Sequence, residues 1–155
     1  MRISVLVQHE DFSMADEYAQ LSRDSSCGAV VTFCGLVREL SCDLKTGTGK
    51  LHCMTLEHYP GMTEQALLAI AEQAQQRWQL GAVRIIHRIG TLTPNEQIVF
   101  VGVASAHRAA AFEAAQFVMD YLKTRAPFWK KEHSSQGQRW VAAKTSDQDA
   151  AERWG

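Results

Sequence analysis

Residues 105–133, SAHRAAAFEAAQFVMDYLKTRAPFWKKEH, predict a long helix that ends at a proline. Apolar side chains recur in this stretch at three- and four-residue steps, the spacing of one buried helical face: Phe112, Ala115, Met119 and Leu122. Ser105 is a residue type that caps a helix start. Pro127 has no backbone N–H and disfavours helical geometry at Ala126, so we expect the helix to end there.

Both ends of this predicted helix carry positive charge. His107 and Arg108 lie at its start, where free N–H groups and the helix dipole favour an anion. The other end has four cationic side chains: Lys123, Arg125, Lys130 and Lys131. At about 1.5 Å per residue, His107 and Lys123 are roughly 24 Å apart. One small ligand cannot touch both ends within one chain, so we expect either two sites or a site shared across a symmetric dimer.

The rest of the chain predicts strands interrupted by further helices. Alternating or β-branched apolar runs predict strands at residues 2–8, 29–37, 51–58, 82–89, 97–104 and 138–144. The run at 29–37 is almost wholly apolar, which indicates a strand covered on both faces, and 97–104 is expected to be central. The order, roughly βαββαββα with a small tail, favours an α+β fold with a mixed sheet.

Three further helices are expected. Ser13 starts a short one, with an inward face at Met14, Tyr18 and Leu21. A longer one opens at Thr63, with an apolar stripe at Leu67, Ile70, Ala71, Ala74 and Trp78. Gly81 is the expected stop of this second helix, and Ser146 can cap a short last one.

Size and charge exclude several classes of protein. The 155 residues and a formal net charge of −1 indicate one domain, residues 1–155, and disfavour nucleic acid as a partner. No apolar run is long enough for a bilayer and no signal peptide begins the chain, so we expect no membrane. The four cysteines form no CxxC pair, which favours reduced thiols in the cytoplasm. Residues 39–50 predict a mobile loop, either a plain connection or a lid.

Lys123 and Lys130 are candidates for chemistry. They lie seven positions apart, which would stack them on one face of an unbroken helix, but Pro127 intervenes and convergence is permitted rather than required. A lysine that is partly desolvated beside other cations can act as an acid, base or nucleophile. We expect Phe128 and Trp129 to seat the turn in the core. For Lys123 the alternative is an exposed lysine that pairs with Asp120 three positions earlier.

Arg38 ends the 29–37 strand, where a guanidinium can bind phosphate or carboxylate with two hydrogen bonds, although a plain strand-end charge is the alternative. Motifs of common nucleotide-binding and hydrolase sites are absent: GxGxxG, the P-loop, HExxH and GxSxG. The histidines lack the spacing of metal ligands. We therefore expect no metal and no cofactor.

Six segments, which together cover nearly the whole chain in order, resemble the large, catalytic subunit of molybdopterin synthase. They are GAVVTFCGLVR (28–38), LEHYPGMTEQAL (56–67), RWQLGAVRIIHRIG (77–90), IVFVGVASAHR (98–108), AFEAAQFVMDYLKTRAPFWKKE (111–132) and RWVAAKTSDQDAAERW (139–154). LEHYPGMTE and MDYLKTRAPFWKKE are long and specific, which makes the resemblance stronger than any short motif.

The resemblance implies a sulfurtransferase of molybdenum cofactor biosynthesis. Its substrate would be cyclic pyranopterin monophosphate (precursor Z), and its product molybdopterin with two dithiolene sulfurs. The sulfur would come from a small ubiquitin-like subunit whose C-terminal Gly-Gly tail carries a thiocarboxylate. The resemblance also implies an α/β hammerhead with a small added β subdomain, and a central homodimer that binds two small subunits as a heterotetramer.

The same resemblance assigns the site. Lys123 and Lys130 would be catalytic, Lys123 at the thiocarboxylate as acid, base and charge stabiliser, and Lys130 in activating the pterin and removing oxygen. Substrate binding would involve both lysines together with Leu36, Val37, Arg38, His107, Arg108, Lys131 and Glu132. The helix length suggests that His107 and Arg108 reach the pocket of the neighbouring subunit. Leu36 stands where we expect a lysine in many relatives.

Two other functions remain open. One is a non-catalytic homodimeric module that binds a phosphorylated ligand or an acidic tail. Retention of Lys123 and Lys130, the latter within FWKKE, argues against it because such a module has little use for both lysines. The other is an RNA-binding domain, which the net charge and the lack of an aromatic RNP-like strand disfavour.

Overall fold

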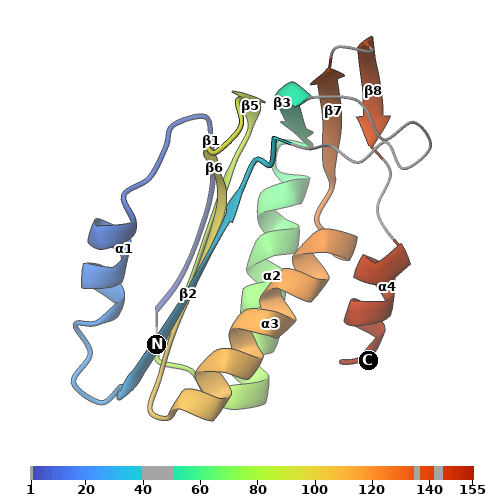
Figure 1. The fold of residues 1–155 in the computed structure, drawn as a ribbon. Helices are drawn as coiled ribbons and strands as arrows, with labels where there is room; N and C mark the ends of the chain where they lie inside the picture. Colours follow the sequence, from blue (N-terminus) through green and yellow to red (C-terminus); the bar gives the residue numbers. More distant parts are fainter. Residues whose placement is uncertain (1, 40–50, 135–136, 142–144) are drawn as a thin grey trace.

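The computed structural model describes residues 2–39, 51–134, 137–141 and 145–155. These residues form two four-stranded sheets and four helices, which confirms the predicted α+β class (Figure 1). The elements are β1 (Arg2–Gln8), α1 (Met14–Leu21), β2 (Ala29–Leu36), β3 (Leu51–His58), α2 (Met62–Trp78), β4 (Ala82–Arg88), β5 (Gly90–Leu92), β6 (Gln97–Ser105), α3 (Arg108–Arg125), β7 (Phe128–Ser134), β8 (Gly137–Val141) and α4 (Thr145–Glu152). Apart from Glu39, the loop predicted at 39–50 lies outside the described residues.

The first sheet is mixed, with the strand order β1-β4-β6-β2. β1 runs parallel to β4, and the other two pairs are antiparallel. α1 covers one face of this sheet, and α2 and α3 cover the other (Figure 1). The larger core lies between the sheet and α2 and α3, where Ile85, Val101 and Phe117 are almost fully buried. β6 is a central strand, as predicted, and it leads directly to the start of α3.

The second sheet is antiparallel throughout, with the order β5-β3-β7-β8, and forms the expected small β subdomain. Its inner face packs Met54 and Leu56 of β3 against Val37 and Leu92. β7 begins directly after Pro127, and the sequence predicted no strand there because its apolar and basic residues show no clear alternation. The strand predicted at 138–144 is observed as β8, although residues 142–144 lie outside the described part.

α3 ends where the sequence predicts but begins differently. Its N-cap is His107, whereas Ser105 is buried as the last residue of β6, so the predicted cap is wrong. Ala126 has extended geometry (φ −83°, ψ 127°), as expected before a proline. Phe112 is 63% exposed and its predicted burial is wrong, because the helix turns its small residues Ala111, Ala114 and Ala115 to the core instead.

Exposure also corrects three other sequence expectations. β2 is an edge strand whose first half is covered on both faces, as predicted, since Val31 packs against the larger core and Val30 against the core on the α1 side. Its second half is not covered in this way, with Phe33 42% and Leu36 51% exposed. Tyr18 lies on the outer side of α1 and is 53% exposed. Trp129 is 47% exposed because successive strand residues point to opposite faces and Phe128 takes the inner one.

Two predicted helix boundaries are also wrong. α2 ends at Trp78, and Gln79 takes the left-handed conformation (φ 51°) that caps it, so Gly81 is not the stop. Gly81 is needed for close packing instead, since a Cβ there would clash with Sγ of Cys27. α4 already includes Ser146, which therefore does not cap it. Among the described helices, none has the length and apolar character needed to cross a membrane.

Candidate functional site

A cavity of about 240 Å³ opens where the C-terminal end of α3 meets the two sheets. Residues from both sheets, α3 and α4 form its wall: Phe33, Gly35, Leu36, Leu56, His87, Ile98, Val99, Met119, Leu122, Lys123, Ala126, Phe128, Lys130, Val141 and Asp147. Most of these side chains are apolar. Among these described lining residues, the ionisable ones are His87, Lys123, Lys130 and Asp147.

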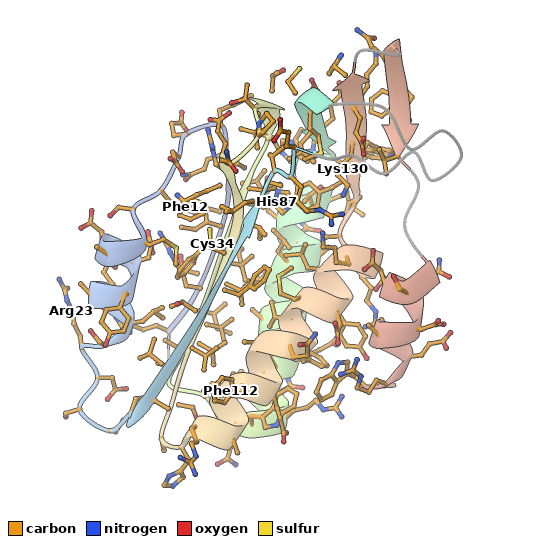
Figure 2. The ribbon with its side chains drawn as sticks, viewed as in Figure 1. Phe12, Arg23, Cys34, His87, Phe112 and Lys130 are labelled. Carbon is orange, nitrogen blue, oxygen red and sulfur yellow. The ribbon has the colours of Figure 1, made fainter. Side chains whose placement is uncertain are left out.

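The cavity brings Lys123 and Lys130 together, which the sequence permitted without requiring. Lys123 lies in the last turn of α3, and Lys130 is the third residue of β7. Between them, Pro127 ends the helix and Ala126 turns the chain into the strand. Figure 2 shows Lys130 at the upper end of the molecule as drawn, close to where α3 ends. The two lysines therefore line one cavity, an arrangement that the sequence left open.

The turn between the lysines is held by Thr63 of α2, which is fully buried. Its hydroxyl donates to the carbonyl oxygen of Pro127 at 2.9 Å and accepts from the backbone N–H of Tyr59 at 3.0 Å. The sequence suggested only that Thr63 opens a helix, because nothing local reveals a partner 64 positions away. Thr63 thus ties the start of β7 to α2, and the pairing of β7 with β3 sets the face on which Lys130 lies.

Lys131 and Glu132 follow Lys130 but differ in direction, because strand side chains alternate between faces. Lys130 pairs with Leu56 on the inner face, and Glu132 pairs with Met54 on that same face. Lys131 lies on the outer face, where its Nζ is 5.5 Å from the ring centroid of Trp140. The structure therefore brings Lys130 to the cavity and turns Lys131 away from it.

His87 is a cavity residue that the sequence analysis missed, having grouped it with the scattered histidines. It lies on β4, is 5% exposed, and stacks on Phe128 with ring centroids 3.8 Å apart and planes 18° apart. Its Nδ1 donates to the carbonyl oxygen of Arg88 at 2.8 Å. The pKa of His87 is lowered to about 4, mainly by burial, and the charges of Lys123 and Lys130 act in the same direction, while the hydrogen bond to the carbonyl of Arg88 acts against them. A histidine directly after the apolar pair Ile85 and Ile86 was the available sequence signal.

Leu36, Val37 and Arg38 differ in their relation to the cavity. Leu36 is half exposed and lines it. Val37 is buried, its N–H donates to the carbonyl of Glu96 at 3.0 Å, and its own carbonyl accepts from the N–H of Asn95 at 2.8 Å. Arg38 is exposed and is not among the described residues that line the cavity.

His107 and Arg108 are exposed at the opposite end of α3 from Lys123. The helix is unbroken over its 18 residues, which at about 1.5 Å each gives roughly 25 Å between its ends. Figure 2 shows this separation, with Phe112 near the start of the helix and His87 and Lys130 beyond its other end. One chain does not bring the two groups together, so their action in a neighbouring subunit's site stays a prediction.

Comparison with known proteins identifies the family. The model of the MoaE protein family matches residues 7–125. The chain belongs to this family. It is 57% identical over 150 residues to the molybdopterin synthase catalytic subunit of Vibrio cholerae and 55% identical to that of Escherichia coli, with 97% of each chain covered in both comparisons. A solved structure, the molybdopterin biosynthesis MoaE protein from Burkholderia ambifaria, matches with a TM-score of 0.82 and 46% identity over 100% of this chain and 99% of that one.

The cavity of this MoaE family member suits a molecule that is partly apolar and carries negative charge. Apolar side chains such as Leu36, Ile98 and Met119 can contact an uncharged ring, while the two ammonium groups attract an anion. Both lysines are near enough to His87 for their charges to disfavour protonation of its imidazole. The cavity can therefore combine anion binding with proton transfer by a lysine.

Proposed function

We propose that this chain is the catalytic subunit of a molybdopterin synthase, a sulfurtransferase of molybdenum cofactor biosynthesis. The observation that carries the proposal is the convergence of Lys123 and Lys130 on one cavity, in a MoaE family chain that matches relatives of this name over 97% of its length. The reaction converts cyclic pyranopterin monophosphate to molybdopterin by inserting two sulfur atoms that form the dithiolene.

The two lysines take different roles in the proposed reaction. Lys123 acts at the thiocarboxylate as acid and base and stabilises charge, because it lies in the exposed last turn of α3. Lys130 activates the pterin and assists the loss of oxygen, since it lies deeper, on the inner face of β7. In each transfer the donor's C–S bond and one C–O bond of the substrate break, and a C–S bond to the substrate forms. The displaced oxygen leaves in water or on the phosphate, and water supplies the oxygen that turns the donor's thiocarboxylate into a carboxylate.

The sulfur donor in this proposal is a small ubiquitin-like subunit with a C-terminal Gly-Gly thiocarboxylate. The relatives are named as catalytic subunits, which supports an assembly with a further subunit. Exposed Phe33 and Leu36 at the cavity wall offer apolar contact to an entering tail. We place the reaction in the cytoplasm, which agrees with the free thiols of Cys27, Cys34 and Cys53.

The proposed assembly is a central homodimer with one small subunit at each end. The support is the length of α3, which holds His107 and Arg108 far from the lysines of their own chain. In the dimer these two residues bind the substrate phosphate in the neighbour's cavity, together with Arg38. Leu36 contributes an apolar contact, and Val37 anchors the chain beside it through its two backbone hydrogen bonds. Glu132 lies on the inner face of β7, whereas Lys131 lies on the outer face and does not contact the substrate.

The decisive experiment mixes the chain with the thiocarboxylated small subunit and cyclic pyranopterin monophosphate and measures dithiolene formation. We expect product with the wild-type chain and a large loss with Lys123→Ala or Lys130→Ala. Arg23→Ala is the matched control, since this exposed cation lies away from the cavity (Figure 2). Binding of the small subunit's tail without any product would instead support a non-catalytic module.

A further inference from the structure

We propose that His87 contacts the substrate: its neutral imidazole accepts, at Nε2, a hydrogen bond from an O–H or N–H group of the molecule bound beside Lys123 and Lys130. This inference rests on the proposed function and deepens it. It adds to the lysines a group of the opposite hydrogen-bonding type, because an ammonium can only donate. Unlike the carboxylate of Asp147, which also lines the cavity, this acceptor carries no charge.

The first support is the orientation of the ring. The carbonyl oxygen of Arg88 can only accept, so Nδ1, which lies 2.8 Å from it, carries the proton of the neutral imidazole. Nε2 then bears the lone pair. Because Nδ1 is turned to the strand's own backbone and the ring lines the cavity, Nε2 is the polar atom that His87 offers to a ligand. No described residue hydrogen-bonds to it.

The second support is that the ring is held in place before any ligand arrives. It is 5% exposed and stacks on Phe128, which directly follows the turn that Thr63 secures. An acceptor that is already ordered loses little conformational freedom on binding and fixes the orientation of its partner. A histidine required only for packing would not need to border an open cavity.

The third support is the surrounding charge. Lys123 on α3, Lys130 on β7 and His58 on β3 all disfavour a proton on His87, and burial does so more strongly, which lowers its pKa to about 4. Arg88 lies next to it on β4, and Asp147 of α4 lines the same cavity. The imidazole is therefore neutral at pH 7 and remains an acceptor even when both lysines are charged. The N–H groups of a pterin and the O–H groups of its hydrated side chain are donors that match this acceptor.

The direct test is nitrogen NMR of the histidine rings in the full chain, with and without cyclic pyranopterin monophosphate and in the absence of the small subunit. We expect the Nδ1–H tautomer for His87 at pH 7 and a shift of its Nε2 resonance when substrate binds. Exposed His9 is the internal control, which should not move. Substrate binding without any change at Nε2 of His87 would overturn this inference alone.

A kinetic test separates contact from packing. His87→Phe keeps a flat ring against Phe128 but has no acceptor, and we expect kcat/KM to fall about 5- to 100-fold, the cost of one unmade buried hydrogen bond. His87→Gln restores an acceptor and should recover part of the loss, and His9→Gln should equal wild type. Wild-type kcat/KM in His87→Phe would overturn the inference. A wild-type chain that neither binds substrate nor forms product would overturn the proposed function instead, and this inference with it.

Discussion

His87 makes the stability of this protein depend on pH in a calculable way. In the unfolded chain a histidine titrates near 6.5, whereas the buried ring has a pKa of about 4. Between these two values the unfolded state binds more protons than the folded state, so the free energy of unfolding falls as the pH is lowered. At pH 5 the factor 1 + 10^(pKa − pH) is about 30 times larger for the unfolded histidine than for the folded one, which lowers the free energy of unfolding by about 2 kcal/mol. At pH 7 the same cost is about 0.2 kcal/mol.

The measurement is urea unfolding of wild type and His87→Gln at pH 7, 6 and 5, at constant ionic strength. The wild type should lose about 2 kcal/mol more than the variant between pH 7 and 5, with the same dependence on urea concentration in both. The carboxyls of Asp11 and Glu96, whose pKa values are lowered chiefly by hydrogen bonds, lose their contributions at lower pH in both proteins and cancel. Equal losses in wild type and variant would refute the assignment of a neutral, buried His87.

Three further predictions concern single side chains. Lys123→Ala should lower turnover by about 100-fold or more, which is the usual contribution of a proton-transfer group. It should change the free energy of unfolding by less than about 0.5 kcal/mol, because the lysine is exposed. Near-wild-type turnover would remove Lys123 from the mechanism. Thr63→Val should lower the free energy of unfolding, measured in urea, by about 1–3 kcal/mol, because it leaves the N–H of Tyr59 and the carbonyl of Pro127 without their buried partner. Thr63→Ser keeps the hydroxyl and should cost less. Equal costs for the two variants would show that the hydroxyl is unimportant. Trp154→Phe should destabilise the chain by about 1–3 kcal/mol in urea unfolding, because the indole N–H donates to Oδ2 of the buried Asp120 at 2.7 Å. Gln116 still donates to Oδ1 in this variant. An unchanged stability would mean that the bond from Gln116 alone satisfies the carboxylate.

Much of the fold follows from local patterns. Alternation and β-branched runs located β1, β2, β3, β4 and β6, and helical periodicity with Pro127 located α3 and its end, because these signals act over a few neighbouring residues. β5 was missed since three residues carry too little pattern. Phe112 and Tyr18 were misplaced because periodicity identifies an apolar stripe but not the angle at which the helix meets its sheet.

The candidate site divides in the same way. Residue types pointed to Lys123 and Lys130, and helix length separated His107 from them, since both depend only on sequence and on helix geometry. His87 could not be found in this manner. Its importance comes from Phe128, Lys123 and Lys130, which lie on two other elements and reach it only through the packing of the two sheets.

Local sequence signals are enough to predict a helix around residues 105–133 that is broken at Pro127, with cations on both sides of the break and at the far end. They do not reveal that the broken end faces a cavity, that Lys130 points inward while Lys131 points outward, or that a neutral histidine lines the cavity with the two lysines. The physical reason is that these directions depend on contacts between distant residues. The hydroxyl of Thr63 holds the turn at Pro127, and the register of β3 with β7 then determines which face each side chain takes.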